Sequence, residues 1–324
     1  MLARHNQSMV PPGHVLVLGG TGFIGAAVVS RFLAQGSVVS AVARHVPCGP
    51  RAASLRGARL CLFDVADRIA LASVLAGVDH VVYALGTPFA SAADRDPVLN
   101  VAQTLPPLIG VLEELRNLPG VGLSFLSSGG TVYGNPPRNP VPEEAPCDPI
   151  TGYGIMKLAA EKYVAMYAAL YGIRARSLRI SNVYGSTQTT GRGQGIVAEL
   201  FRAAQQEDSI TVFGDGDTVR DYVLLDDVAK AVVELASLQG GPTVVNVGSG
   251  QGHSVNEVAS LVERITGSHI QRDWRQRRPF DIAEIVLDVS RLTNSIAWQP
   301  VPLDEGLKST WDALIAASDT GQNE

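Results

Sequence analysis

Val15-Leu-Val-Leu-Gly-Gly-Thr-Gly-Phe-Ile-Gly25 is the stretch around which the chain is organised. Its first four residues are apolar and indicate a buried parallel strand, and residues 26–33 carry apolar side chains at helical spacing. The glycines between them allow a tight turn whose backbone N–H groups approach a ligand, and the positive end of the following helix favours a diphosphate. The pattern alone also fits an incidental turn, but its place between strand and helix predicts dinucleotide binding by Gly19, Gly22, Phe23, Ile24 and Gly25.

The composition narrows the class of protein. The 324 residues are 46% hydrophobic and 18% charged, which indicates a globular chain of one large or two modest domains. The net charge of −5 and the lack of a basic stripe argue against nucleic acid as a partner. Three cysteines without metal-type spacing indicate free thiols, no metal site and a cytoplasmic location. No apolar run has membrane-spanning length, and residues 1–13 and 318–324 are expected to be flexible.

Strand-like and helix-like runs alternate along the first part of the chain. Strands are expected at residues 15–18, 37–43, 60–63, 79–84, 122–127 and 175–180, and helices at 26–33, 69–76, 96–118 and 153–171. This α/β order predicts a Rossmann-type, doubly wound parallel sheet. Pro106-Pro107 falls inside one of these helices and predicts a kink or a break there.

The character of the sequence changes after Gly185, which predicts a smaller mixed α/β substrate domain towards the C-terminus. Helices are expected at residues 196–206, 226–238, 255–266 and 302–317, strands at 210–213 and 244–247, and loops at 187–194 and 272–281. The predicted Rossmann domain comprises residues 14–185 and 219–249. The predicted substrate domain comprises residues 186–218 and 250–317.

The end of the second strand bears on the choice between NAD and NADP. A fold that binds NAD usually places an acid there to accept hydrogen bonds from the adenosine ribose, but this strand ends Ala41-Val-Ala-Arg-His45. Arg44 can pair with a 2′-phosphate or stack on adenine, and it can equally be a solvated charge. Asp64 and Val65 follow the third strand, where the carboxylate can hold the adenine amino group or cap a turn. Arg44 therefore favours NADP, but the choice between NAD and NADP stays open.

Tyr153-Gly-Ile-Met-Lys157 places a phenol and an ammonium one helical turn apart. A cation beside a phenol favours the phenolate and lowers its pKa. Such a phenol can take a proton from a sugar hydroxyl, or return it, while a hydride moves to or from nicotinamide. Tyr-x-x-x-Lys is a common surface pattern and does not by itself indicate an active site. It does so here because of its position after the strand that ends near Ser127.

Five motifs occur in the order seen in extended short-chain dehydrogenases/reductases. They are Gly19-x-x-Gly22-x-x-Gly25, Ser127-Ser-Gly-Gly-Thr-Val-Tyr-Gly134, Tyr153-x-x-x-Lys157, Arg179-Ile-Ser-Asn-Val-Tyr-Gly185 and Arg220-Asp-Tyr222. From about Val15 to Trp311 the chain resembles the NAD-dependent epimerase/dehydratase family, and within it the UDP-glucose 4-epimerase branch.

The resemblance implies roles for individual residues. Tyr153 would be the general acid/base, and Lys157 would bind the nicotinamide ribose and tune the phenol. Asn100 would lie near the nicotinamide. The cofactor channel would be lined by Ala84, Leu85, Gly86 and Ile180. The sugar nucleotide would be held by Asn182, Phe213, Arg220, Arg278 and Asp281. Without the resemblance, the arginines around Arg278 would be read as a solvated basic loop.

One position departs from the family. Its third catalytic residue is a Ser or Thr that hydrogen-bonds the reacting hydroxyl, and that position falls on Gly129. Ser128 and Thr131 are the candidates to replace it. Thr131 is slightly favoured, because it has the same parity as position 129 along an extended chain, whereas Ser128 would point the other way.

The resemblance implies a nucleotide-sugar 4-epimerase that works on a UDP-hexose or UDP-N-acetylhexosamine through a transient 4-keto sugar and bound NAD(P). An NADPH-dependent 4-keto reductase is the alternative, and Arg44 favours it. A dehydratase fits less well, because the acid/base pair expected after the catalytic hydroxyl is replaced by Gly130 and Thr131. A non-catalytic dinucleotide-binding regulator is the alternative from another class. A homodimer is expected by family analogy.

Overall fold

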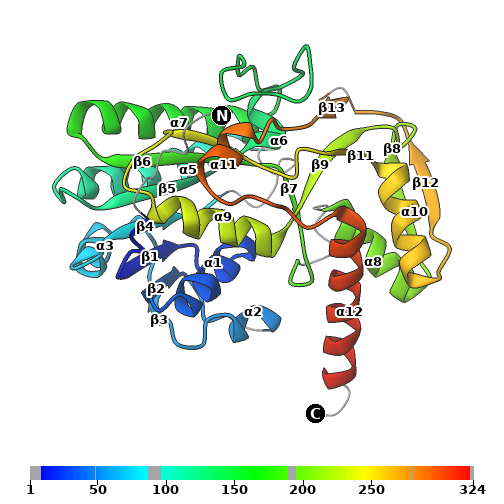
Figure 1. The fold of residues 1–324 in the computed structure, drawn as a ribbon, viewed down its shortest axis with the longest axis horizontal. Coiled ribbons are helices and arrows are strands. Elements are labelled where there is room, and N and C mark those ends of the chain that lie inside the picture. The colour runs from blue at the N-terminus through cyan, green and yellow to red at the C-terminus, as the bar shows by residue number, and fades with distance from the viewer. Residues whose placement is uncertain (1–8, 48, 87–95, 189–194, 279, 322–324) are drawn as a thin grey trace.

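The computed structural model describes residues 9–47, 49–86, 96–188, 195–278 and 280–321 (Figure 1). The predicted loop at 187–194 therefore lies largely outside the described residues. Within this part of the chain, no helix combines the length and the apolar character needed to cross a membrane.

A seven-stranded parallel sheet forms the larger part of the molecule, in the order β10-β6-β5-β4-β1-β2-β3. Its inner strands are buried on both faces, as their continuous apolar runs predict, whereas the edge strand Arg59–Leu62 is largely exposed. The strand order reverses between β1 and β4, where folds of this class bind ligands at the carboxyl ends of the strands. The strands are β1 (His14–Leu18), β2 (Val38–Ala43), β3 (Arg59–Leu62), β4 (His80–Tyr83), β5 (Gly122–Ser128), β6 (Arg174–Ile180) and β10 (Val244–Val247).

Helices cover both faces of this sheet, which confirms the doubly wound prediction. Helices α1 (Phe23–Ala34) and α9 (Leu225–Ser237) pack on one face, with the short α11 (Ser290–Ser295) beside them. Helices α3 (Arg68–Leu75), α5 (Pro97–Leu115) and α7 (Gly152–Tyr171) pack on the other. Two short helices, α2 (Pro50–Ala53) and α6 (Gly129–Val132), follow β2 and β5.

Helix α5 continues through Pro106 and Pro107, so of the kink or break expected there the break does not occur. Its buried face includes Leu108, Val111 and Leu112, which pack into the core beneath the sheet. Tertiary packing on both sides of the prolines therefore outweighs the backbone hydrogen bonds that they remove.

The remaining elements form a small lobe with its own core (Figure 1). Strand β9 (Val219–Leu224) pairs with β7 (Asn182–Tyr184), β11 (Gly252–Ser254) and β13 (Glu284–Ile285), and β8 (Ser209–Phe213) pairs with β12 (Gln271–Arg275). Helices α8 (Ile196–Gln206), α10 (Val255–Thr266) and α12 (Leu303–Gly321) complete the lobe. The first part of the loop predicted at 272–281 is thus a strand, because its backbone pairs with β8.

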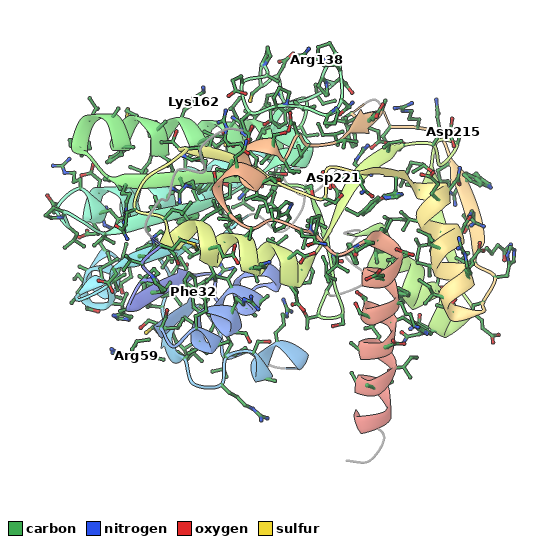
Figure 2. All side chains as sticks on the ribbon, in the orientation of Figure 1. Phe32, Arg59, Arg138, Lys162, Asp215 and Asp221 are labelled. Atoms are coloured by element: carbon green, nitrogen blue, oxygen red, sulfur yellow. The ribbon has the colours of Figure 1, made fainter. Side chains whose placement is uncertain are left out.

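Asp221 joins the small lobe to the sheet (Figure 2). Its buried carboxylate accepts hydrogen bonds from the backbone N–H groups of Ser249, Gly250 and Leu287 and from the Ser249 hydroxyl. Strand β9 therefore lies in the small sheet while α9, which follows it directly, packs on the large one. The domain boundaries drawn from the sequence remain a prediction.

Candidate active site

The glycine turn after β1 is shaped by close backbone contacts. Gly19 has φ +82°, a conformation that favours glycine, and a Cβ on it would lie 3.0 Å from the Ala84 carbonyl oxygen. A Cβ on Gly25 would lie 2.2 Å from the Gly19 carbonyl oxygen, so α1 can approach the turn only with glycine there. Gly22 caps α1 without a side chain, so the first turn of the helix can face an anion. These features fit a dinucleotide diphosphate.

The ends of the neighbouring strands meet this turn. The N–H groups of Gly19 and Gly20 both donate to the Val42 carbonyl, at 3.1 and 3.2 Å, which ties the turn to the end of β2. Arg44 follows β2 and is exposed, so its guanidinium is accessible to a ligand at the turn. The Asp64 carboxylate accepts the Ala66 N–H at 2.9 Å, which is the turn-capping contact considered for it, and Val65 is buried.

The residues that follow β4 lie in space between the glycine turn and α7. Leu85 contacts the space beside Gly19, since its Cδ2 would lie 3.1 Å from a Cβ at that position. Gly86 is close to the ammonium of Lys157, whose Nζ would lie 3.7 Å from a Cβ on Gly86. Leu85 and Gly86, which follow β4 and were predicted for the cofactor channel, therefore lie between the glycine turn and the Tyr153–Lys157 pair.

Helix α7 places Tyr153 and Lys157 in its first turns. The Thr151 hydroxyl accepts the Gly154 N–H at 3.1 Å and so fixes the start of the helix. The Lys157 Nζ donates to the Leu126 carbonyl at 2.7 Å and lies 5.8 Å from the centre of the Tyr153 ring. Asn100 of α5 donates to the Gly152 carbonyl at 3.1 Å, so a second helix braces the start of α7.

The pKa values differ from the sequence-based expectation. Burial raises the pKa of Tyr153 to about 12, and a hydrogen bond from Ser128 partly opposes that effect. Burial lowers the pKa of Lys157 to about 8, which the Glu161 carboxylate partly opposes. The expected lowering of the Tyr153 pKa by Lys157 is wrong for the ligand-free protein, because desolvation dominates and the ammonium is directed to the Leu126 carbonyl.

The hydroxyl next to the phenol belongs to Ser128, not to the slightly favoured Thr131. Ser128 is the last residue of β5, and α6 begins at Gly129, so the alternation of an extended chain ends before Thr131 is reached. The Thr131 hydroxyl turns back to the Ser128 carbonyl, 3.5 Å away. A Cβ on Gly129 would lie 2.6 Å from Leu287 Cδ1, so no larger residue fits there without a shift.

A cavity of about 510 Å³ lies between β8, β9 and α8 in the small lobe. Its lining includes all five residues predicted to bind the sugar nucleotide, namely Asn182, Phe213, Arg220, Arg278 and Asp281. Asn182 Oδ1 also lies against Gly130 of α6, so the cavity begins beside the turn that carries Ser128. Among the described residues, no cluster of His, Cys, Asp or Glu is arranged to hold a metal ion.

Arginine and aromatic side chains form one end of this cavity. The Arg278 guanidinium pairs with Asp281 at 2.7 Å and lies 4.3 Å from the centre of the Phe213 ring. Phe280 lies on it as well, at 5.2 Å. Arg220 donates to the Val219 carbonyl at 2.8 Å, and burial lowers its pKa. Two cations at one cavity suit a diphosphate, and the aromatic faces suit a base or a sugar.

Comparison with known proteins agrees with this geometry. Residues 15–248 match the NAD dependent epimerase/dehydratase family. This chain belongs to that family.

The UDP-glucose 4-epimerase of Mycolicibacterium smegmatis is 32% identical over 91% of this chain and 96% of its own length. The Thermotoga maritima UDP-glucose 4-epimerase, solved with UDP-glucose, is 29% identical with a TM-score of 0.87, covering 94% of this chain and 99% of that one. The Thermus thermophilus enzyme, solved with NAD, is 30% identical with a TM-score of 0.86 over 94% and 99% of the two chains.

Membership of the epimerase/dehydratase family confirms the resemblance inferred from the five ordered motifs. The structure brings four of those motifs to the carboxyl edge of the sheet, where Gly19, Ser128, Lys157 and Ile180 lie at or just beyond the ends of strands or on the helix packed against them. The fifth, Arg220-Asp-Tyr222, lies on β9 and lines the cavity.

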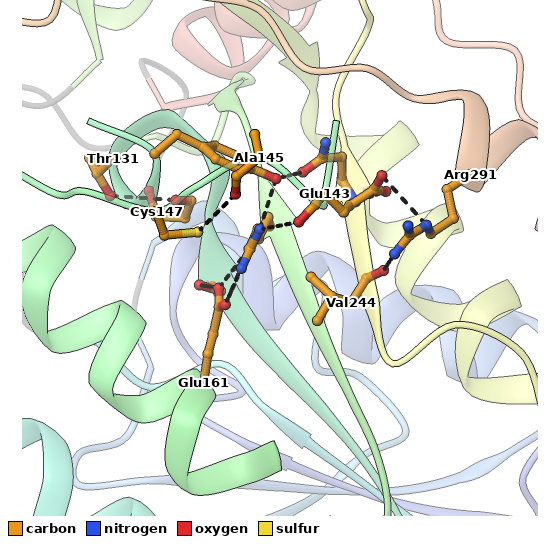
Figure 3. A network of polar contacts seen from close by, with 12 residues as sticks. Thr131, Glu143, Ala145, Cys147, Glu161, Val244 and Arg291 are labelled. Carbon is orange, nitrogen blue, oxygen red and sulfur yellow. Dashed lines mark hydrogen bonds and ion pairs between the residues drawn. The ribbon is translucent and has the colours of Figure 1, made fainter. Parts of the chain in front are cut away.

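Sequence reasoning missed a buried polar cluster behind Lys157 (Figure 3). Glu161 pairs with Arg179 at 2.7 Å, and both side chains are buried. Arg179 also donates to the Tyr133 hydroxyl at 2.9 Å, and that hydroxyl donates to Asn246 at 2.7 Å. The available signal was the spacing, because Glu161 lies four residues after Lys157 on the same face of the helix.

Proposed function

We propose that this protein is a UDP-sugar 4-epimerase that acts through a transient 4-keto sugar. The observation that carries the proposal is the group formed by Ser128, Tyr153 and Lys157 between the glycine turn and the cavity that holds Arg220 and Arg278. Relatives of the same family and nearly the same length bear the same activity in their names. The substrate class is a UDP-hexose or a UDP-N-acetylhexosamine.

The residues divide the chemistry between them. The Tyr153 oxygen takes the proton of the sugar 4-hydroxyl and later returns it, and the Ser128 hydroxyl holds the reacting oxygens in line. Lys157 supplies positive charge near the phenol and a donor for the nicotinamide ribose. When bound, the nicotinamide supplies a reversible hydride acceptor, and the protein supplies position and proton transfer. Because Tyr153 has a raised pKa in the ligand-free protein, the cationic ring of a bound, oxidised nicotinamide would favour its ionised form.

The cavity would hold the UDP part of the substrate. Of the three arginines that line the cavity, Arg202 pairs with Glu199 and Asp208, so Arg220 and Arg278 are the ones proposed for the diphosphate. Asp281 holds Arg278 in place and offers acceptors near the ribose. Phe213 stacks on the same guanidinium and would face the base. Asn182, next to Gly130, would contact the sugar at the end of the cavity that faces Tyr153.

The dinucleotide is NAD or NADP, and Arg44 affects the choice between them. Its exposed side chain follows β2, where an acid would select NAD. We propose that this arginine allows a 2′-phosphate, so that the protein binds NADP as well as NAD.

An NADPH-dependent 4-keto nucleotide-sugar reductase is the second candidate, and the position of Arg44 favours it. A non-catalytic dinucleotide-binding regulator is a third, and the intact Tyr153–Lys157 pair argues against it. The Tyr153→Phe variant separates this last possibility, because an enzyme loses most turnover and keeps dinucleotide binding, whereas a regulator keeps its response.

We also propose a homodimer formed through α5 and α7. These two helices pack against each other and expose the apolar side chains Val98, Val101, Ile155, Met166 and Leu170. A second copy of the chain would cover them. Light scattering of the Leu170→Glu variant should show fewer dimers than the unaltered protein, and a monomeric unaltered protein would exclude this part of the proposal.

A cytoplasmic location is proposed from the cysteines. Cys61 is buried and Cys147 half-buried, and both are free thiols. Free thiols are typical of a reducing compartment.

The proposed function is tested with purified protein, a UDP-hexose or UDP-N-acetylhexosamine, and no added dinucleotide. Formation of the C4 epimer supports the epimerase. The reductase is supported instead if no epimer forms and NADPH is consumed only when a 4-keto sugar nucleotide is supplied.

A further inference from the structure

Three consecutive residues at the end of β5 each bond to α7. The Leu126 carbonyl accepts the Lys157 ammonium at 2.7 Å. The Ser127 hydroxyl donates to Glu161 Oε1 at 2.5 Å. The Ser128 hydroxyl is a hydrogen-bonding neighbour of the Tyr153 phenol, whose pKa it lowers. Because the three α7 partners are spaced four residues apart, they form one face of the helix, and the proposed active-site pair occupies two of its three positions.

Glu161 is the best anchored member of this face. Arg179 of β6 donates to its carboxylate through Nη2 at 2.7 Å and through Nε at 3.1 Å to each oxygen. Arg179 lies directly beside Ser127 in the register of the sheet. The pair therefore joins α7 to two adjacent strands, and only 5% of either residue is exposed.

The Arg179 guanidinium is itself held from the opposite side. Its Nη1 donates to the Tyr133 hydroxyl and to the Glu143 carbonyl, at 2.9 and 3.2 Å. Glu143 accepts the Asn246 N–H at 2.8 Å and pairs with Arg291 at 3.5 Å (Figure 3). The position of Glu161 is thus fixed by contacts from β5, β6 and the segment that follows α6.

We propose that Glu161 is a positioning residue for the reaction: with Arg179 and Ser127 it fixes the register of α7 against the end of β5, and so places Tyr153 and Lys157 relative to Ser128. The geometry favours this role over a purely stabilising one. A buried ion pair is weak support for stability, because an apolar pair of similar volume is often as stable, whereas such a pair can specify a single packing arrangement.

Glu161 also acts on Lys157 through its charge. Burial lowers the pKa of Lys157, and the Glu161 carboxylate opposes that effect. The other ionisable groups around this face are Tyr153 and Lys162 on the same helix, Arg179 on β6, and Tyr133, Glu143 and Cys147 on the segment after β5. Replacing Glu161 with glutamine removes the only negative charge in the described surroundings of Lys157 that counters its desolvation, and leaves the Arg179 cation unpaired.

The first test compares Glu161→Gln with Glu114→Gln. Glu114 is a matched control, since it pairs with Arg68 at 2.6 Å on α5, away from the site. We expect Glu161→Gln to lower kcat about 100-fold, as expected for a misplacement of about 1 Å, while KM for the sugar nucleotide changes less than about threefold. Ser127→Ala, which keeps the ion pair, should lower kcat about tenfold, and Glu114→Gln should leave it unchanged.

The second test does not depend on turnover. The chain has four lysines, Lys157, Lys162, Lys230 and Lys308, so their ε-carbons can be labelled with ¹³C and titrated by NMR in the protein alone. Lys157→Met assigns the Lys157 signal. We expect Glu161→Gln to move the Lys157 titration to lower pH, and Glu114→Gln not to move it.

The kcat test rests on the proposed function, but the lysine titration does not, so the two can fail separately. An unaltered protein without epimerase activity contradicts the proposed function and leaves the titration as the test of Glu161. The inference is overturned if Glu161→Gln lowers only the melting temperature, with an unchanged Lys157 titration and an unchanged kcat per folded molecule. If Glu161→Gln does not fold, Ser127→Ala decides: kcat equal to that of the unaltered protein overturns the inference.

Discussion

The Ser128 hydroxyl lies next to the Tyr153 phenol and lowers the pKa of that phenol, against the effect of burial. This contact exists because β5 ends at Ser128 and the chain turns into α6 at Gly129, which packs against Leu287. A Cβ on Gly129 would lie 2.6 Å from Leu287 Cδ1, so the hydroxyl beside the phenol comes from the preceding residue and not from position 129.

Ser128→Ala should lower kcat about 100-fold, because it removes the hydroxyl that lies next to the phenol and lowers its pKa. Thr131→Ala is the matched control and should change kcat less than about threefold, since its hydroxyl is directed to the Ser128 carbonyl. Steady-state kinetics with the sugar nucleotide measure both. A large loss in Thr131→Ala with little loss in Ser128→Ala would reverse the assignment.

Lys157→Met should abolish most activity and yet stabilise the protein at neutral pH. Burial lowers the pKa of Lys157 from 10.5 to about 8, so below pH 8 the folded state holds a charge that it disfavours relative to the unfolded state. Removing that charge should raise the free energy of unfolding by about 2–3 kcal/mol, measured by urea denaturation at pH 7.

The stability gained by Lys157→Met should depend on pH. Between pH 8 and 10.5 the unfolded state binds more protons at Lys157 than the folded state, so the unaltered protein gains stability as pH rises. The advantage of Lys157→Met should therefore shrink across this window. An advantage that is constant from pH 7 to pH 10 would show that the lysine is not desolvated.

Arg278→Lys should weaken UDP binding about tenfold or more. A lysine cannot make the forked contact with Asp281 or stack on Phe213, so its charge would no longer be held at the cavity. Arg272→Lys is the control, because Arg272 pairs with Glu263 at 3.0 Å and does not line the cavity. Calorimetric titration with UDP compares the two, and equal affinities would place the diphosphate elsewhere.

Arg44→Asp should shift the preference between dinucleotides towards NAD. An acid at the end of β2 can accept hydrogen bonds from ribose hydroxyls and repels a 2′-phosphate. We expect the ratio of NADP to NAD affinity to fall about tenfold, which corresponds to about 1.4 kcal/mol. Fluorescence titration with both dinucleotides measures the ratio. If the ratio does not change, Arg44 is a solvated charge.

The sequence predicted the larger part of the fold because strong local signals agreed with one another. The glycine turn between β1 and α1 and the alternation of strands and helices define the sheet and its switch point. The pair Tyr153 and Lys157 was identified from spacing and order along the chain. Their environment could not be read in the same way, and the raised pKa of Tyr153 follows from burial that no sequence motif displays.

Some expectations differ from the structure for particular physical reasons. Thr131 was slightly favoured over Ser128 by strand parity, but that parity stops at Ser128 where α6 begins, and which hydroxyl acts in the reaction stays a prediction. Residues 272–275 were predicted as part of the basic loop 272–281, because their pairing with β8 is non-local. Glu161 and Arg179 lie far enough apart in the sequence that only the packing of α7 on β6 reveals their ion pair.

The most direct test of the central claim follows the hydrogen at C4. Purified protein is supplied with a UDP-hexose that carries deuterium at C4, in ordinary water and without added dinucleotide. If the 4-keto sugar forms and is reduced again in the same site, the C4 epimer should keep its deuterium at C4. Formation of the epimer with solvent hydrogen at C4, or no epimer at all, would contradict the account.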